Sequence, residues 1–346
     1  MIFSFSAMPI RVMPALWPAE VPAMRILVTG GSGYIGTRLL LAFGARPGVE
    51  EVVNVDIRPP REPIPRVRFV ERSVTEDLRD IFRDKTRPID VAMHLAWIVD
   101  PMRDGARQRA ICMGGSERFL EGCAAGDVRH VFFMSSGTAY GAHPEHREPL
   151  PESAPLRPEF HFQYSAEKRE AEALFVLFAA GRPGTLVQVA RPCVVGGPHV
   201  ANFIFRAMDR PLNVRVLGHD PGVQLVHEDD VAAALVAIVE SRKPGAFNVA
   251  GDGMMPMSEC YRRLGARVLP LPMGAVRGLV GLAWRRGWTW LAEAPPEFVP
   301  FLAYPWLLSN RRIKEELGFR FRYTAEQTLE SYLTSRRRGV TSTTAA

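Results

Sequence analysis

Lysine is scarce in this chain. Only Lys85, Lys168, Lys243 and Lys314 occur among the 43 lysines and arginines of the 346-residue sequence, so arginine carries nearly all of the positive charge. The arginines are scattered and form no basic block, although the net charge is +6. A nucleic-acid-binding surface needs clustered basic residues, and the sequence therefore predicts no nucleic-acid partner.

Cysteine is also sparse. The four cysteines, Cys112, Cys123, Cys193 and Cys260, show no C-x-x-C spacing and no accompanying histidine pattern. This arrangement favours free thiols in a reducing compartment, which predicts a cytoplasmic protein, and it predicts no metal site.

Long uncharged apolar runs are missing as well. The apolar segment 273–292 is interrupted by Arg277, Arg285 and Arg286. A membrane-spanning helix needs roughly 18 apolar residues with few or no charges, so we expect no stable membrane span. We predict amphipathic helical pieces that line a pocket; an interfacial contact with a membrane is the alternative.

Both ends of the chain lack clear helix or strand patterns. Residues 1–23 are apolar, broken by prolines and without the basic region of a signal peptide. We expect a flexible extension over 1–23, with Met24 as an alternative start, and a disordered tail over 336–346.

Short apolar runs alternate with helical patterns in the first part of the chain. The runs that predict strands are 25–29, 51–55, 67–70, 90–96, 130–135 and 186–191. Such alternation predicts an α/β fold, a Rossmann-type doubly wound parallel sheet covered on both faces. We expect a sheet domain from 24–192 and 223–250, and a smaller C-terminal lobe from 193–222 and 251–335.

A glycine-rich turn follows the first predicted strand. Gly30, Gly33 and Gly36 lie between that strand and a helical pattern, and Asp56 ends the next strand. Such glycines let the backbone approach a pyrophosphate, and the carboxylate accepts hydrogen bonds from a ribose, favouring NAD over NADP. The alternative is a plain glycine-rich turn with a solvated aspartate.

A tyrosine and a lysine stand four residues apart in a predicted helix. Tyr164 and Lys168 therefore share one helix face. Ser135 and Ser136 end a buried strand, where α/β sheets place their chemistry. An ammonium and an oxidised nicotinamide lower a tyrosine pKa, so that the phenolate takes the proton of an alcohol held by a serine. A surface Tyr–Lys pair with a turn serine is the alternative.

The chain resembles the extended short-chain dehydrogenase/reductases, the NAD-dependent epimerase/dehydratase group. Ordered motifs across about residues 24–335 carry the resemblance: TGGSGYIG, HLA, SSGTAYG, YSAEK, RPCVVGGP, VHEDDVAAAL and FNVAGDG. It implies an NAD-binding domain, a substrate-binding lobe and catalytic roles for Ser136, Tyr164 and Lys168. The residues it implies for NAD binding are Gly30, Gly33, Tyr34, Ile35, Gly36, Asp56, Ser73, Val74, Leu95, Ala96, Tyr164, Lys168, Arg191 and Pro192. It also implies a homodimer packed through about 102–126 and 162–180.

The sequence departs from the family pattern at several positions. Cys112 stands where the family has an asparagine, and Ser73 where it has an aspartate near the adenine. Val223 replaces an arginine used by sugar-nucleotide members, and the apolar 301–306 replaces a later arginine-rich segment. A nucleotide-sugar diphosphate needs cationic anchors, for which Arg206, Arg210 or Arg215 are substitutes.

Other candidate signals have plainer explanations. His94 at a strand end is expected to pack beneath the cofactor, and the acids of 227–230 to cap the following helix. Two interpretations remain for a set of aromatic residues, which either fill the core or line an apolar pocket: Trp97, Trp284, Trp288, Trp290, Tyr304 and Trp306.

Together these features predict an NAD-dependent enzyme that transfers hydride at a secondary alcohol or its ketone. Epimerisation, dehydration and dehydrogenation all begin with that step. The usual cationic anchors are missing, and the lobe contains apolar segments. Both features favour a small-molecule substrate of steroid, isoprenoid or acyl type. A nucleotide-sugar epimerase or dehydratase is the alternative, and a non-catalytic NAD sensor the second.

Overall fold

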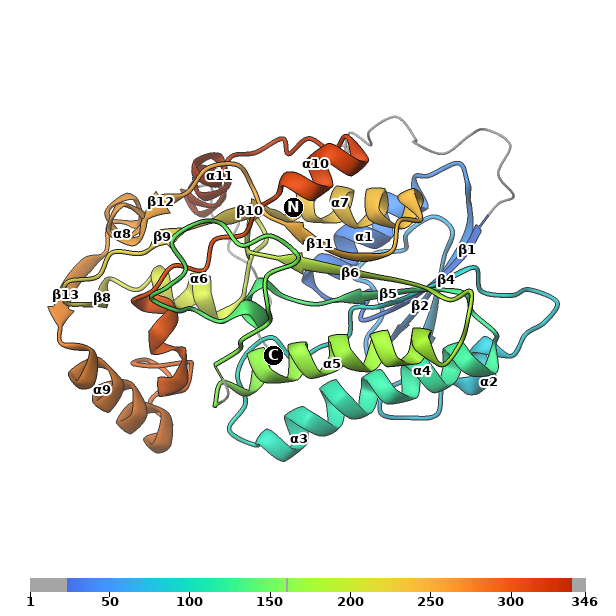
Figure 1. Cartoon of the computed structure of the whole chain (residues 1–346), viewed down its shortest axis with the longest axis horizontal. Coiled ribbons are helices and arrows are strands. Elements are labelled where there is room, and N and C mark those ends of the chain that lie inside the picture. The colour runs from blue at the N-terminus through green and yellow to red at the C-terminus, as the bar shows by residue number, and fades with distance from the viewer. Residues whose placement is uncertain (1–23, 160, 338–346) are drawn as a thin grey trace, which may run out of the picture.

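The computed structural model describes residues 24–159 and 161–337 (Figure 1). The extension expected over 1–23 lies outside the described residues, as does most of the tail expected over 336–346. Arg336 and Arg337 form the end of the last helix.

Seven parallel strands form the central sheet. In spatial order they are β11 (Gly245–Val249), β6 (Leu186–Pro192), β5 (His130–Met134), β4 (Val91–His94), β1 (Met24–Thr29), β2 (Val49–Asp56) and β3 (Val67–Glu71). The strand order reverses between β1 and β4, and sheets of this kind bind ligands beyond the carboxyl ends of their strands at such a point. The predicted α/β, Rossmann-type doubly wound fold is confirmed.

Helices cover both faces of the sheet (Figure 1). One face carries α1 (Tyr34–Gly44), α7 (Glu228–Ser241) and α10 (Arg311–Leu317). The other carries α2 (Arg79–Phe82), α3 (Gly105–Arg109), α4 (Gly115–Ala125) and α5 (Gln163–Ala180). Side chains of β1 alternate between two cores, with Ile26 and Val28 in the first and Leu27 in the second, because successive strand residues face opposite sides.

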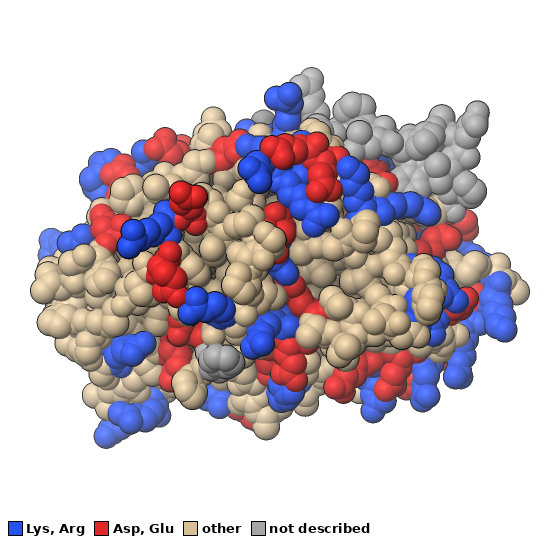
Figure 2. Space-filling model, viewed as in Figure 1, with Lys and Arg blue, Asp and Glu red and all other residues tan. Residues whose placement is uncertain are grey.

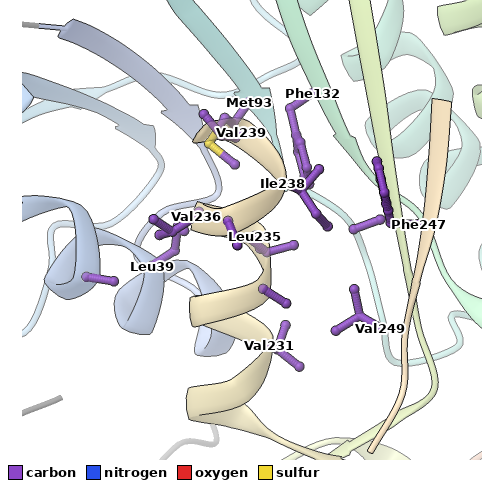
Figure 3. Packing of buried hydrophobic residues seen from close by; sticks show 14 of the residues in the cluster. Leu39, Met93, Phe132, Val231, Leu235, Val236, Ile238, Val239, Phe247 and Val249 are labelled. Atoms are coloured by element: carbon purple, nitrogen blue, oxygen red, sulfur yellow. The ribbon is translucent and has the colours of Figure 1, made fainter. Parts of the chain in front are cut away.

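Helix α7 is apolar around most of its circumference because it is enclosed by the sheet and α1. Figure 3 shows Leu235 and Ile238 pointing toward Phe132 and Phe247 of the sheet, while Val236 points toward α1. All three α7 side chains are buried, so this helix belongs to the core of the sheet layer.

The remaining elements lie beyond the carboxyl end of the sheet, at the left of Figure 1. The short strands are β7 (Val194–Gly196), β8 (Leu212–Val216), β9 (Gly222–Val223), β10 (Leu225–His227), β12 (Met255–Pro256) and β13 (Arg267–Leu271). The helices are α6 (Phe203–Met208), α8 (Met257–Leu264), α9 (Met273–Arg286), the 3-10 helix η3 (Pro296–Leu302) and α11 (Ala325–Arg337). Over 24–159 and 161–337, none of the helices has both the length and the apolar character that crossing a bilayer requires.

Candidate active site

The glycine-rich turn joins β1 to α1 at the reversal of strand order. Gly30 has φ +74°, and a Cβ there would lie 2.6 Å from the backbone of Ala96. A Cβ at Gly36 would lie 2.2 Å from the carbonyl oxygen of Gly30. These two glycines are therefore required by the turn itself, which brings the chain against the residues that follow β4.

Helix α1 begins at this turn with its first N–H groups uncapped by any side chain. Gly33 is its N-cap residue, and no acidic residue lies in its first turn. The N–H groups at a helix N-terminus attract an anion because their partial positive charges add up there. The turn thus fits a pyrophosphate, the part of a dinucleotide that such a site holds.

Asp56 lies beside the turn at the end of β2. The backbone N–H of Ser32 donates to its Oδ2 at 3.0 Å, and that of Ile57 donates to its Oδ1 at 2.8 Å. The carboxylate is half-buried and retains acceptor capacity, so it fits the predicted contact with a ribose. The residues present therefore fit NAD.

Two residues that shape this turn, Gly31 and Asn54, were not predicted from the sequence. The side-chain amide of Asn54 donates to Ser32 Oγ at 3.0 Å, and a Cβ at Gly31 would lie 2.3 Å from Asn54 Oδ1. The adjacent glycines at 30 and 31 were a usable signal, whereas the role of Asn54 depends on a contact between β2 and the turn.

Four of the residues expected to bind NAD mainly contact the protein itself. The hydroxyl of Tyr34 donates to Glu228, and Ile35 packs against the core on the α1 face. The Ser73 hydroxyl lies 2.8 Å from that of Thr75. Val74 is buried against Gly115, so close that a Cβ on this glycine would touch it. The four side chains therefore have their contacts within the protein at the edge of the sheet.

Three further expected residues lie at strand ends. Leu95 donates its backbone N–H to Thr29 at 3.1 Å, which places Leu95 and Ala96 directly beside the turn. Pro192 ends β6, one strand beyond the serines of β5. Backbone groups at these positions line the carboxyl edge of the sheet, where the resemblance implies NAD binding.

Arg191 is committed to a buried ion pair. Its guanidinium contacts Glu172 of α5 at 2.6 Å and donates to the hydroxyl of Tyr140, also at 2.6 Å. Ser135 donates to the same glutamate from the end of β5. The side chain therefore ties β6 to α5. Its guanidinium is used within the protein, so it supports the position of these two elements, and its expected contact with the cofactor stays a prediction.

Ser136, Tyr164 and Lys168 converge at the end of β5. The Ser136 side chain lies near enough to Tyr164 to lower the pKa of the phenol, and the ammonium of Lys168 lies 5.8 Å from the centroid of the Tyr164 ring. The carbonyl oxygen of Met134 accepts from Lys168 Nζ at 2.6 Å. Lys168 is buried and Tyr164 is half-buried beside the serine that follows β5, so the two residues do not form a surface pair.

Thr138 orients the Ser136 hydroxyl and was missed by the sequence analysis. Its backbone N–H and its hydroxyl both donate to Ser136 Oγ, at 3.2 and 3.0 Å. With its acceptor sites used in this way, the Ser136 hydroxyl has its proton left to donate toward the Tyr164 oxygen. This donation favours the ionised phenol.

Burial dominates the protonation of both helix residues. It raises the pKa of Tyr164 to about 12, opposed by the hydrogen bond from Ser136. It lowers the pKa of Lys168 to about 7. The expectation that Lys168 lowers the tyrosine pKa is not met in this structure, because the ammonium is turned toward Met134 and the face of Trp97, whose centroid is 3.7 Å away.

A π-helical turn, η1 (Ala110–Gly114), holds Cys112 beside this centre. It joins α3 to α4, and the Cys112 sulfur accepts from the N–H of Ile98 at 3.5 Å. Burial raises the pKa of this thiol to about 11, so it stays neutral at physiological pH. A neutral thiol is a weak hydrogen-bonding group and cannot replace the amide of the asparagine that the family has at this position.

The two histidine-containing motifs are structural. His94 lies between the hydroxyls of Thr29 and Ser116, at 2.7 and 3.1 Å, and burial lowers its pKa to about 3. The prediction that acids cap α7 was wrong, because the imidazole of His227 accepts from the N–H of Asp229 at 3.2 Å. Within the described parts of the chain, no cluster of three metal-ligating side chains occurs.

A pocket of about 310 Å³ opens beside Tyr164. Its walls come from three segments distant in the sequence: Pro101, Met102, Arg103, Gln108, His161, Phe162, Gln163, Tyr164, Trp284, Pro295 and Glu297. Tyr164 forms part of the pocket wall, and its side chain packs against a buried aromatic cluster of Phe162, Phe203 and Phe301. A proton acceptor at this position can act on the hydroxyl of a small molecule in the pocket.

The six aromatic residues for which two interpretations were open do not all follow the same one. Trp284 lines the pocket, while Trp306 packs on Phe301 at 5.2 Å and Tyr304 on His219 at 5.4 Å. Trp97 lies under Lys168. Trp288 and Trp290 are 38% and 73% exposed, so they neither fill the core nor line this pocket.

Comparisons with known proteins agree with this geometry. The model of the NAD dependent epimerase/dehydratase family matches residues 26–250. An uncharacterized protein of Mycobacterium tuberculosis is 27% identical over 323 residues, which cover 91% of this chain and 84% of that protein.

Two curated relatives have a named activity. The 4-hydroxy-2-methyl-3-oxo-4-farnesyl-3,4-dihydroquinoline-1-oxide ketoreductase of Stigmatella aurantiaca is 26% identical, over 89% of this chain and 95% of that enzyme. A 3 beta-hydroxysteroid dehydrogenase/Delta 5-->4-isomerase of Mycobacterium tuberculosis is 30% identical, over 50% of this chain and 47% of that enzyme.

Solved structures share the fold. The dTDP-glucose 4,6-dehydratase of Streptomyces venezuelae, solved with NAD bound, superposes with a TM-score of 0.70 at 20% identity, over 91% of this chain and 97% of that one. The chain therefore belongs to the NAD-dependent epimerase/dehydratase family, and it is an oxidoreductase of the extended short-chain dehydrogenase/reductase type whose cofactor is NAD.

Proposed function

We propose that this enzyme oxidises a secondary alcohol, or reduces the corresponding ketone. The Tyr164 oxygen is the group that takes or returns the hydroxyl proton of the substrate. The observation that carries the proposal is the placement of Tyr164 on the wall of the pocket, near Ser136 and on one helix face with Lys168. The N-terminus of α1, Asp56 and the backbone at Leu95 would hold NAD, which when bound supplies the hydride acceptor.

The residues of the chain divide the proton chemistry among them. Tyr164 takes the hydroxyl proton of the substrate, which requires the phenolate that burial disfavours. Ser136 stabilises that phenolate or the substrate oxygen by donating its remaining proton, which Thr138 orients. Lys168 lies on the same helix face, but its ammonium donates to the Met134 carbonyl, so in this geometry it ties α5 to the end of β5 and does not lower the tyrosine pKa.

We propose an apolar substrate of steroid, isoprenoid or acyl type. The three arginines that would have to replace the missing diphosphate anchors are held by acids: Arg206 and Arg210 contact Glu293 at 2.6 and 2.8 Å, and Arg215 lies 3.9 Å from Asp220. Neutralised cations attract a diphosphate weakly. The farnesyl and steroid substrates in the names of the two curated relatives support the same class.

A nucleotide sugar is the second candidate because of Arg103. This arginine lines the pocket and donates to the carbonyl oxygen of Trp284 at 3.0 Å, with no carboxylate partner among the described residues. It is a possible anchor for one phosphate, and the shared fold of sugar-nucleotide enzymes is compatible with it.

Calorimetry on the NAD-loaded protein separates the two candidates. We expect a hydroxysteroid or a farnesylated ketone to bind, and UDP-glucose to give no heat of binding at micromolar concentration. Absorbance of the reduced cofactor then reports turnover of the ligand that binds. Micromolar UDP-glucose binding that free UDP abolishes would replace the apolar substrate with the nucleotide sugar.

We also propose a cytoplasmic homodimer. Helix α5 exposes an apolar stripe of Ala173, Val176, Leu177 and Ala180, in which the two larger residues are 60% and 68% exposed. The residues lie three or four positions apart, the spacing of a helix-packing face. All four cysteines are free and buried, which fits a reducing compartment. Light scattering tests the dimer: Leu177→Glu should give monomers, whereas Arg311→Glu, at an exposed position of α10 outside both expected interface segments, should not.

A further inference from the structure

The end of α9 carries an exposed group of aromatic and basic side chains that the proposed function does not use. Trp288 and Trp290 follow the helix, with their rings stacked at 6.4 Å and with 38% and 73% of their surfaces exposed. Leu282, also 38% exposed, lies on the same helix. Single exposed apolar residues are ordinary, but three large ones beside one helix end form a surface that water solvates poorly.

The helix cap fixes this group in place. Gly287, with φ +75°, ends α9, and the N–H of Trp288 donates back to the carbonyl oxygen of Ala283 at 2.9 Å. Ala283 and Val276 are fully buried on the inner side of the helix. The tryptophans are therefore held against the outer end of a packed helix and do not hang on a free loop.

Three arginines lie on the same helix: Arg285 and Arg286 directly precede the tryptophans, and Arg277 lies two helical turns earlier. Arg277, Arg285 and Arg286 are exposed, and none forms an ion pair with any residue of 24–159 or 161–337. At the lower left of Figure 2, where Figure 1 places α9, the outermost side chains are basic. Favourable interaction with the helix C-terminus accounts for Arg285 and Arg286, but not for Arg277 or for the two exposed tryptophans.

The group is continuous with the mouth of the pocket. Trp284, one helical turn before Trp288, lines the pocket, and the Arg103 guanidinium lies 5.2 Å from its ring centroid. One side of α9 therefore borders the Tyr164 pocket while its outer end presents Trp and Arg to the surroundings.

We propose that the α9 end, defined as Leu282, Arg285, Arg286, Trp288 and Trp290, docks on the surface of an anionic lipid bilayer, with Arg277 earlier on the helix adding positive charge. Tryptophan prefers the boundary between headgroups and acyl chains, and unpaired arginines are attracted to anionic lipids. Docking there brings the pocket mouth to the layer in which apolar molecules dissolve. The contact is peripheral, and vesicle binding can be measured without turnover, so it does not rest on the proposed function.

Co-sedimentation of the full chain with vesicles tests the proposal. We expect binding to vesicles of phosphatidylcholine mixed with phosphatidylglycerol, weaker binding as salt is raised, and little binding to phosphatidylcholine alone. Arg285→Glu should weaken binding by at least about fivefold, because one basic residue near an anionic surface contributes roughly 1 kcal/mol. The double variant Trp288→Ser/Trp290→Ser should lose most binding and the shift in tryptophan emission that accompanies it.

Matched controls separate docking from general surface effects. Met254→Ser removes another exposed apolar side chain, and Arg311→Glu reverses another exposed arginine, both away from α9. Both controls should bind vesicles like the unmodified protein. No binding to anionic vesicles, or equal losses in the controls, overturns the proposal. Light scattering that showed the tryptophan variant to lose self-association would also overturn it, by assigning the surface to a second copy of the chain.

Discussion

The proposed catalytic residues and the wall of the Tyr164 pocket differ in how their polar groups are held. We call Ser136, Tyr164 and Lys168 the floor, although of these three only Tyr164 lines the pocket, and we call the lining residues Arg103, Gln108 and Trp284 the rim. On the floor, Ser136 accepts twice from Thr138, and Lys168 donates to the Met134 carbonyl inside the protein. On the rim, Arg103 is exposed and contacts a single carbonyl oxygen, that of Trp284. The floor therefore allows little change in geometry, whereas rim side chains can be exchanged at small cost to folding.

This difference assigns different kinetic roles to the two regions. A floor residue acts on the reacting hydroxyl, so its loss lowers kcat for every substrate. A rim residue contacts the part of the substrate that does not react, so its loss raises KM and changes the ranking of substrates. The following substitutions test that division.

Tyr164→Phe should have the largest effect. Loss of the proton acceptor lowers kcat by about 100-fold or more, while the dissociation constant of NAD stays unchanged because the ring is kept. Stopped-flow absorbance and cofactor titration measure the two quantities. A variant that retains more than about a tenth of the unmodified rate would remove Tyr164 from the floor chemistry.

Lys168→Met should lower turnover by less than Tyr164→Phe does, and it should stabilise the protein. Burial lowers the Lys168 pKa in the folded state to about 7, below its ordinary value near 10.4. The unfolded chain therefore binds more protons between these pH values, so the lysine destabilises the fold fully below pH 7 and ceases to do so above about pH 10.4.

The expected gain is about 1–3 kcal/mol in the free energy of unfolding below neutral pH, shrinking as the pH rises. Urea titrations at several pH values measure it, and Lys243→Met, at an exposed lysine, is the control. A gain that grows with pH would contradict the assigned direction of the pKa shift.

Trp284→Ala should change the rim without changing the floor. The loss of buried aromatic surface raises KM for a hydroxysteroid by about tenfold, with kcat altered by less than about threefold. Trp290→Ala, six residues after Trp284 and outside the pocket wall, is the matched control and should leave both constants unchanged in the absence of lipid. A fall in kcat as large as that of Tyr164→Phe would erase the distinction between floor and rim.

Asp56→Ala, outside the pocket, should give the smallest change. It removes the acceptor expected to contact the adenosine ribose and reduces NAD affinity by about tenfold, with a smaller loss for NADP. Kinetics with each cofactor at fixed substrate measure the ratio. If the preference for NAD over NADP did not change, the cofactor would be selected by other residues, and Arg58 and Arg61, the basic residues that follow β2, would be tested next.

The sequence predicted the floor better than the rim for a physical reason. The six strands expected from apolar runs are all present, each within two residues of its predicted ends. The Tyr164–Lys168 spacing is local, so one helix turn brings the two side chains together. Gly30 and Gly36 were recognisable because only glycine tolerates the close contacts of that turn.

The missed features depend on contacts between distant segments. The pairing of Arg191 with Glu172 joins a strand to a helix, and Trp97 meets Lys168 across the end of the sheet. The rim combines 101–103 with 284–297, and no local pattern marks that encounter. The wrong assignment of the α7 cap had another cause, since His227 uses its ring nitrogen where the adjacent acids were expected to act.

The π turn at Ala110–Gly114 sets the rotational phase of one part of the rim. Each residue of an α-helix advances the chain by about 100°, so removing one residue from this turn would rotate everything before it by that angle. Gln108, which donates to Glu167 of α5 at 3.3 Å and lines the pocket, would then face away from both. A single deletion at 110–114 would therefore change the shape of one wall of the pocket, although every rim residue would still be present in the sequence.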